Sequence, residues 1–372
     1  MLAVFVQFLC LGCISFGGPA AHIGYFRRVF VEQKAWLSAD EFAAKLALCQ
    51  FLPGPSSSQL GFAIACHRAG PLGGVLAFLG FTLPSFFLMY LFATVGQNLS
   101  LFESGAVQGL KLLAVVVVVD AIFTMAKQFC SSAATRVLAL MSAILLLVQM
   151  TPLTQFSLLL LAAVVMAWRA PANSGAYRFQ FPFSSVVSGG LFLVLLVASL
   201  VFSGHLFSQF YQVGAAVFGG GHVVLPLLET LLSGAVEQDY FLSGYAAAQA
   251  VPGPMFSFAS FLGAEMWPES SLAGAGLACV AIFLPGFLLL LMIEPGWHAL
   301  SQLSKPKAAI AGVNAVAVGM LIAAWINPVL SHAPEGWLAT LLAVLGFWAL
   351  RSGRCPVLVL IASFTGIGQL LW

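Results

Sequence analysis

Long apolar runs alternate with short polar turns along the whole chain. About thirteen such runs can be marked, and most are long enough for a helix to cross ~30 Å of hydrocarbon. Helices are expected in all of them, because an open strand leaves its backbone N–H and C=O groups without partners in lipid. The runs cover residues 2–22, 41–67, 71–94, 105–126, 136–150, 153–168, 186–203, 206–228, 241–267, 272–293, 306–326, 336–350 and 355–371. The pattern predicts an all-α, polytopic integral membrane protein.

Composition supports a lipid environment. Hydrophobic residues make up 61% of the 372 residues and charged residues only 7%, whereas a soluble domain carries about 25% charged residues. The net charge is +2 and no basic run is present, so nucleic acid is not an expected partner. The stretch Met1–Ile14 lacks a positive leading segment and an Ala-x-Ala exit, so we expect it to belong to the first span and not to a cleaved signal peptide.

Seven cysteines are scattered along the chain, mostly inside apolar runs. An odd, dispersed set does not suggest a disulfide framework. Cys10 and Cys13 form a C-x-x-C pair, which is compatible with metal or redox chemistry. We favour buried thiols that pack as small hydrophobic groups, and we expect no metal or other cofactor.

The chain repeats itself. The first half contains Phe16-Gly17-Gly18 and Pro53-Gly54-Pro55, and the second contains Phe218-Gly219-Gly220 and Pro252-Gly253-Pro254. Further matched pairs are Phe8 and Phe210, Gly12 and Gly214, Phe42 and Phe241, Gln50 and Gln249, Pro84 and Pro285, and Gly109 and Gly312. Internal duplication is a common way to build a transporter. We therefore predict an N-terminal repeat over residues 1–170, a linker over 171–185, and a C-terminal repeat with a leading extra span over 186–372.

Loop charges indicate how the halves are oriented. Loops at matching positions carry opposite signs, with Arg27, Arg28, Lys34 and Lys45 in the first half against Glu229, Glu237 and Asp239 in the second. Positive residues favour the cytoplasmic side, so opposite signs predict an inverted repeat.

The path of the two Pro-Gly-Pro segments stays open at this point. Single crossings suit the inversion, but with an inside N-terminus they leave the basic loop near Arg27 on the wrong side. Segments that dip in and return suit the loop charges, but give the run 186–203 the wrong parity. Single crossings are favoured.

The two Pro-Gly-Pro motifs should break their helices near the membrane midplane, because each proline removes a backbone N–H and clashes one turn back. The N–H groups behind Pro55 and Pro254 would then lie at positive helix ends, which attract anions. Paired interrupted helices are the usual sequence sign of a transporter's binding site, although two ordinary proline kinks are the alternative. The Phe-Gly-Gly stretches serve equally well for ligand contact or for close helix packing. The expected anion-binding residues are Gly17, Gly18, Gln50, Pro53, Gly54, Pro55, Ser56, Ser57, Ser58, Gly219, Gly220, Gln249, Pro252, Gly253, Pro254 and Ser257.

Ionisable residues deep inside the runs are few. Asp120 is a candidate for coupling or gating, because a charge at the bilayer centre costs on the order of 3 kcal/mol; the alternative is an interfacial ion pair with Lys127. Lys111, at the position matched by Asn314, is a candidate anion contact or a side chain that reaches out from a helix end. His22 and His222 follow the Phe-Gly-Gly stretches at unequal spacings and are not expected to titrate.

Five stretches carry a resemblance to a known family. FGGPAAHIGYFRR, the WLS–EF stretch at residues 36–42, QFLPGP, FGGGHVVLPLLE and QAVPGP resemble the long, two-domain form of the chromate transporter (CHR) family. The resemblance covers essentially the whole chain. It implies a bacterial inner-membrane protein with antiparallel halves that expels chromate and confers chromate resistance. One departure is that the second half lacks the counterpart of Trp36 in the stretch Gly234–Tyr240, which weakens any claim that both halves contact the anion alike.

Other functions are less well supported. Sulfate or another oxyanion is the nearest alternative substrate, because sulfate and chromate are both tetrahedral dianions. An intramembrane enzyme would need a nucleophile–base set or paired carboxylates, and only Asp120 is available within a run. A cation transporter would need clustered ligands, which Cys10 and Cys13 do not supply. A homo-oligomer stays open.

Overall fold

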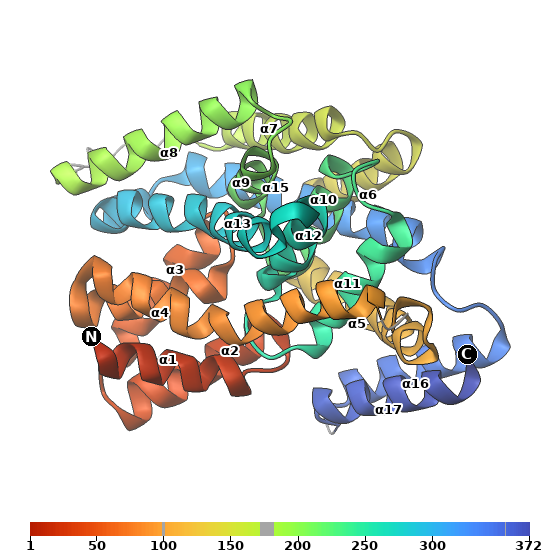
Figure 1. Ribbon diagram of the computed structural model, residues 1–372. Coiled ribbons are helices and arrows are strands. Elements are labelled where there is room, and N and C mark those ends of the chain that lie inside the picture. The colour runs from red at the N-terminus through yellow and green to blue at the C-terminus, as the bar shows by residue number, and fades with distance from the viewer. Residues whose placement is uncertain (99–100, 172–181, 354) are drawn as a thin grey trace.

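The structure, a computed structural model, describes residues 1–98, 101–171, 182–353 and 355–372, and its elements are helices (Figure 1). The first half comprises α1 (Leu2–Ile14), α2 (Gly18–Phe26), the π-helix η1 (Arg27–Gln33), α3 (Ala39–Phe51), α4 (Ser56–Asn98), η2 (Leu101–Glu103), α5 (Gly105–Phe129), α6 (Ala133–Val148) and α7 (Pro152–Arg169). The extra helix α8 (Phe183–Val201) follows. The all-α prediction is confirmed.

The second half repeats this order of elements. It comprises α9 (Leu206–Ala216), η3 (Gly221–Val223), α10 (Val224–Leu231), α11 (Gln238–Ala250), η4 (Met255–Ser257), α12 (Phe258–Met266), η5 (Pro268–Ser270), α13 (Ser271–Ile293), η6 (Glu294–Gly296), α14 (Trp297–Leu300), α15 (Ser304–Ala324), the π-helix η7 (Trp325–Leu330), α16 (Trp337–Arg351) and α17 (Val357–Leu371). The backbone of α4 leaves the helical region at Ala69 and Gly70, which divides α4 into two parts. The first part corresponds to α12 and the second to α13. The expected linker 171–185 lies mostly outside the described residues.

Matched glycines make matched contacts in the two halves. A Cβ on Gly12 of α1 would lie 2.6 Å from the backbone oxygen of Phe81, and a Cβ on Gly214 of α9 would lie 2.1 Å from that of Ile282. Both glycines therefore let a short helix cross the long helix of its own half at backbone contact. The repeat seen in the sequence is thus a repeat of packing.

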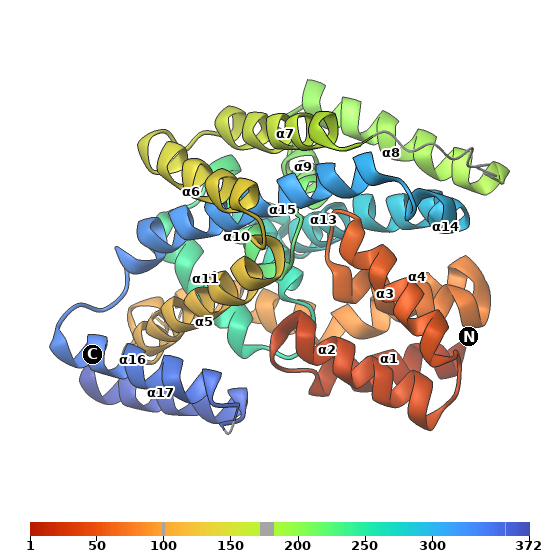
Figure 2. The same cartoon turned by 180° about the vertical axis from the view of Figure 1, so that it is seen from behind.

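The last helices of each half cross over to the other half. Helix α17 packs on α5, and α7 packs on α15; Figures 1 and 2 show α16 and α17 side by side at the edge of the molecule near the C-terminus. The crossings again use matched glycines: a Cβ on Gly109 would lie 2.0 Å from the Phe364 oxygen, and one on Gly312 would lie 2.6 Å from the Ala162 oxygen. The two halves are therefore interlocked and do not form separate bodies.

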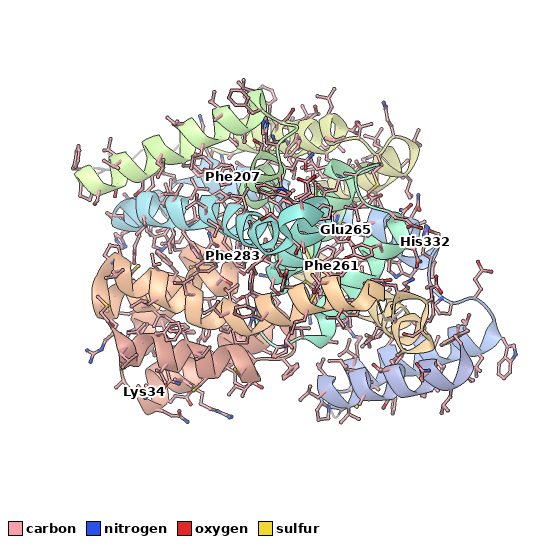
Figure 3. The ribbon with its side chains drawn as sticks, viewed as in Figure 1. Lys34, Phe207, Phe261, Glu265, Phe283 and His332 are labelled. Atoms are coloured by element: carbon pink, nitrogen blue, oxygen red, sulfur yellow. The ribbon has the colours of Figure 1, made fainter. Side chains whose placement is uncertain are left out.

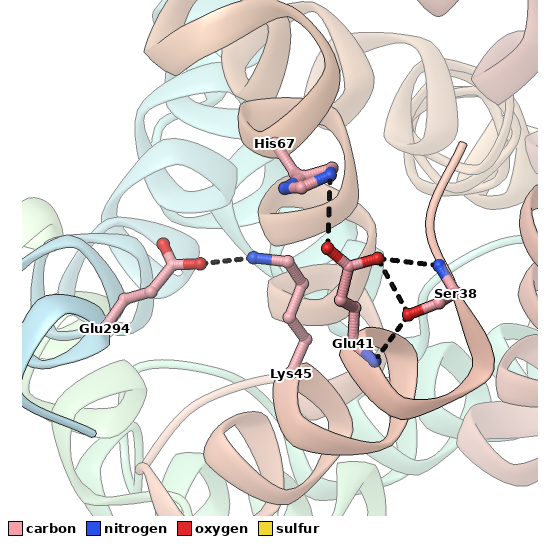
Figure 4. Close-up of polar contacts among 5 residues, drawn as sticks. All are labelled: Ser38, Glu41, Lys45, His67 and Glu294. Carbon is pink, nitrogen blue, oxygen red and sulfur yellow. Dashed lines mark hydrogen bonds and ion pairs between the residues drawn. The ribbon is translucent and has the colours of Figure 1, made fainter. Parts of the chain in front are cut away.

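The first Pro-Gly-Pro segment dips in and returns. Glu41, in the first turn of α3, has its Oε1 atom 4.0 Å from Nε2 of His67, near the end of the first part of α4 (Figure 4). Ser38 caps α3 and donates to Glu41 from its backbone N–H and its hydroxyl, which holds the pKa of that carboxyl below its ordinary value. Since the two outer ends of residues 41–67 meet, the segment is a helical hairpin, and the preference for a single crossing is wrong. Apolar runs have the same hydropathy whether they cross or return.

The second Pro-Gly-Pro segment folds in the same way. The rings of Tyr240 and Phe261 are 4.5 Å apart and those of Tyr245 and Phe258 are 5.9 Å apart. The pairing runs backwards along the sequence, so α11 and α12 are antiparallel.

The sequence predicts a single span over residues 2–22, but the structure has two helices there, α1 and α2. The chain turns at Gly17 and Gly18, whose φ values are +97° and +72°. Phe8 of α1 then meets Phe26 and Phe30 on the returning stretch, with ring centroids 5.7 Å and 4.9 Å apart. Phe-Gly-Gly is therefore a second kind of helix break, because left-handed backbone angles favour glycine.

Six helical stretches in the described part are long and apolar enough to cross a membrane: Ser56–Gly96, Gly105–Phe129, Pro152–Arg169, Phe183–Val201, Pro268–Leu300 and Ser304–Leu330. Figure 3 shows Lys34 at the periphery, while Phe261 and Phe283 are fully buried where α4, α12 and α13 pack together.

Cys10 and Cys13, expected to be buried, are exposed on α1, because that face of the helix is apolar and points outward.

Candidate functional site

The four helix breaks meet at the centre of the molecule through two reciprocal hydrogen bonds. The backbone N–H of Gly54 donates to the oxygen of Val217 at 2.7 Å, and that of Gly253 donates to the oxygen of Ser15 at 2.9 Å. Val217 and Ser15 are the residues just before the two Phe-Gly-Gly stretches. Each Pro-Gly-Pro tip is therefore tied to the Phe-Gly-Gly break of the opposite half.

Each tip also rests on the long helix of the opposite half. A Cβ on Gly54 would lie 3.1 Å from Cα of Gly286, and one on Gly253 would lie 2.9 Å from Oγ of Ser85. The φ values of Gly54 and Gly253 are +115° and +103°, so glycine is required both by the backbone angle and by the close approach. Gln59 secures the first tip, because its Nε2 donates to the oxygens of Pro53 and Gly286 at 2.9 Å and 3.0 Å.

A cavity of about 280 Å³ opens beside these tips. By the same measure, one water molecule needs only ~10–15 Å³, so the cavity has room for a small, partly hydrated ion. Three helix breaks contribute to its wall, through Gly17–Pro19, through Gly54 with Ser56, and through Gly219–His222. The remaining wall comes from α3, α5 and α11 and from the α16–α17 pair.

The N-terminal ends of two broken helices bring partial positive charge to this wall. The first N–H groups of α2 and α4 have no partner within their own helix and lie at the positive end of the helix dipole. Gly18 and Gly220 have open space where a side chain would be, at φ +72° and +137°, so bare backbone faces the cavity there. Such a surface suits a small oxyanion.

About half of the residues expected to bind the anion are brought together in the cavity wall. Those that line it are Gly17, Gly18, Gln50, Gly54, Ser56, Gly219, Gly220, Gln249 and Asp120. Those that do not are Pro53, Pro55, Ser57, Ser58, Pro252, Gly253, Pro254, Ser257, Lys111 and Asn314. The first tip reaches the cavity through Gly54 and Ser56, whereas the second lies behind it.

Asp120 faces the cavity from α5 and is paired with an arginine. Its Oδ1 accepts a hydrogen bond from Nη1 of Arg351 at 3.1 Å, so the alternative pairing with Lys127 is wrong. The guanidinium of Arg351 also lies over the rings of Phe123 and Phe347, 5.5 Å and 5.8 Å from their centroids. Arg351 comes from α16 of the other half, and so the pair fastens that helix to the cavity wall.

Lys111 does not reach the cavity. Its side chain is 3% exposed, and its Nζ donates to Oδ1 of Asp239, in the first turn of α11, at 2.6 Å. A buried cation with a partner at this distance is held in place and does not reach out from a helix end. Asn314 lies just behind the wall, because its Oδ1 would be 3.4 Å from a Cβ on Gly219.

Sequence reasoning missed part of the wall. Thr124 and Gln128 follow Asp120 at intervals of four residues and line the same cavity; this spacing marks one helix face and could have revealed them. His222 also lines the cavity, although only its position after Phe-Gly-Gly pointed to it.

Comparison with known proteins identifies the family. The model of the chromate transporter family matches residues 2–168 and 204–369, which together make up most of the chain. This protein belongs to the chromate transporter family. The two matched regions leave out α8, the extra helix between the repeats.

Relatives with curated names cover most of the chain. A chromate transport protein of Pseudomonas aeruginosa is 26% identical over 352 residues, covering 87% of this chain and 80% of that protein. A chromate transport protein of Cupriavidus metallidurans is 28% identical over 339 residues, covering 86% and 80%. A probable chromate transport protein of Synechococcus elongatus is 27% identical over 378 residues, covering 97% and 93%. No solved structure gave a significant match.

Proposed function

We propose that this protein exports chromate across the bacterial inner membrane, confers chromate resistance, and binds the dianion in the cavity beside the helix breaks. The observation that carries the proposal is that broken helices of both halves converge on one cavity. Discontinuous helices whose N-termini point at an anion are a recurrent substrate site in transporters. Relatives named as chromate transport proteins supply the substrate.

The charge of the substrate supports export. A dianion that leaves a cell with a negative interior gains ~2.3 kcal/mol per charge per 100 mV, or ~4.6 kcal/mol for two charges. Export therefore needs no ATP. Import of the same ion would have to be coupled to protons or sodium.

The cavity wall offers both attraction and a means of release. Backbone N–H groups at Gly17, Gly18, Ala20 and Ser56 supply partial positive charge without a full cation. The carboxylate of Asp120 adds a repulsive contribution, which its pairing with Arg351 offsets. Binding that is favourable but not tight suits a transporter, which must let its substrate leave.

Flux into everted vesicles tests the proposal. Vesicles that contain the protein should take up labelled chromate when the lumen is made positive, faster than vesicles without it. Labelled sulfate serves as the parallel substrate, because it has the same shape and charge. Uptake of sulfate with no uptake of chromate would assign the protein to sulfate, and uptake of neither would refute the proposed oxyanion export.

A further inference from the structure

Among the residues that the structure describes, His222 is the one histidine in the wall of the cavity. It lies in η3, directly after the glycines at 219–221 that turn the chain, and the residue is partly exposed. Its Nδ1 atom lies 3.2 Å from the hydroxyl of Tyr245 on α11. The ring is thus held from one side by the second Pro-Gly-Pro hairpin and is open to the cavity on the other.

The second ring nitrogen is available for a ligand. Nε2 of His222 has no hydrogen-bond partner in the part of the chain that the structure describes. The atom is not buried, so a ligand in the cavity can reach it. When the Tyr245 hydroxyl donates to Nδ1, the ring carries its proton on Nε2. In that tautomer the contact with Tyr245 leaves an N–H donor at Nε2, on the side of the ring that faces the cavity.

The other half offers no equivalent side chain. Counting from Phe16 and Phe218, the position matched to His222 is Ala20, which lines the same cavity without a donor. After the Pro-Gly-Pro breaks it is the first half that supplies a polar side chain to the cavity. Ser56 lines the cavity, while Met255, Phe256 and Ser257 of the second half do not. At these glycine-containing breaks, the first half therefore offers the side chain of Ser56 after Pro-Gly-Pro, and the second half offers that of His222 after Phe-Gly-Gly.

We infer that His222 contacts the substrate and donates a hydrogen bond from Nε2 to one oxygen of the tetrahedral oxyanion, with Tyr245 as the positioning residue. The inference rests on the proposed function, since it assigns a contact within that site. The two halves then bind the anion differently. The first half contacts the anion at Ser56, beside the hairpin tip, and the second half contacts it at His222, in the turn after Phe-Gly-Gly.

His22 provides a matched control from the first half. It follows Phe-Gly-Gly as His222 does and is 1% exposed. Both of its nitrogens already have protein partners: Nδ1 lies 3.3 Å from Ser57 Oγ and Nε2 lies 3.2 Å from the oxygen of Ser15. His22 therefore joins two breaks internally and leaves no donor for a ligand, so its replacement should affect folding and not affinity for the anion.

Two amide variants separate the two ring nitrogens of His222. In His222→Gln the side-chain nitrogen can take the place of Nε2, and in His222→Asn it takes the place of Nδ1 beside Tyr245. The dissociation constant of labelled chromate, measured on purified protein in detergent, should stay near the wild-type value for His222→Gln. It should rise by about ten- to a hundredfold for His222→Asn, the range for loss of a hydrogen bond to a charged group. His22→Gln and His22→Asn should not differ from each other in affinity.

Tyr245→Phe keeps the ring and removes the hydroxyl that orients His222. Its affinity should fall by a smaller factor, and this variant serves as the test if neither amide variant folds. Equal affinity in wild type, His222→Asn and Tyr245→Phe would overturn the assignment. Wild-type protein that neither binds nor exports chromate would refute the proposed function and the inference with it, whereas binding without export would refute only the proposed export.

Discussion

Replacement of Gly54 by valine should strongly reduce transport, because it strains the backbone and creates a collision with the opposite half. Gly54 has φ +115°, a region that costs a β-branched residue ~1–3 kcal/mol. Its new Cβ would also lie 3.1 Å from Cα of Gly286, and overpacking of this kind costs a further ~1–3 kcal/mol. Because the obstacle is backbone, the tip must move away from α13, and the bond from the Gly54 N–H to Val217 is lost.

Gly253→Val should be milder in its effect on affinity. Its Cβ would meet Oγ of Ser85 at 2.9 Å and Cβ of Ser85 at 3.1 Å, so this tip must shift as well, and a lower rate of transport is expected. Gly253 does not line the cavity, however, whereas Gly54 does. Gly54→Val should therefore raise the apparent KM for chromate more than Gly253→Val, while both lower the rate.

The assay is uptake of labelled chromate by everted vesicles, with the amount of inserted protein measured in the same samples. Gly70→Val is the matched control, since Gly70 has φ +71° at the kink of α4 and open space where a side chain would lie. It carries the backbone strain without the collision and lies away from the cavity. Normal insertion and wild-type export by both Gly54→Val and Gly253→Val would place the anion site elsewhere and reduce the breaks to kinks.

Three further predictions follow from the charges. Asp120→Asn should lower the rate of chromate export by about tenfold without loss of insertion, because a carboxylate that faces the anion aids its release; an unchanged rate would leave Asp120 a structural role. Single cysteines at Arg68 and Glu265, in a background free of native cysteines, should label from opposite sides of the membrane if the halves are inverted, and labelling from one side would rule the inversion out. Lys45→Glu and Glu294→Lys should each lower thermal stability, since the ion pair between α3 and η6 is only 14% and 31% exposed (Figure 4), and the double exchange should restore part of it, with a coupling of about 0.5–3 kcal/mol in a double-mutant cycle.

Much of the fold could be predicted because it depends on local features. Apolar runs predicted helices in lipid, since no other open structure satisfies its backbone there. The prolines at 53 and 55 predicted a break at Gly54, because the steric conflict arises within one turn. The repeat was visible because the same contacts, such as those of Gly12 and Gly214, require the same small residue in both halves.

The candidate site was predicted only in part, and the failures share one cause. Asp120 was identified, but its partner Arg351 is 231 residues away along the chain, and Lys111 meets Asp239 across 128 residues. Ser57 and Ser58 resemble Ser56 in sequence, yet the helix rotates them away from the cavity. His222 could not be told from His22 until their partners were known.

By itself, the sequence determined the helices, their breaks and their doubling, because each of these follows from residues within a turn or two of one another. The tertiary structure decided the path and the exchange of the helices. The Pro-Gly-Pro segments return instead of crossing, as the approach of Glu41 to His67 shows for the first of them, and each tip bonds to the opposite half through Gly54 with Val217 and Gly253 with Ser15. Hydropathy indicates the length of an apolar run and its compatibility with lipid. It does not indicate which distant backbone oxygen will accept a hydrogen bond from the unpaired N–H at a helix break. That choice is made only when both halves pack, because a buried donor without a partner costs more than almost any single contact gains.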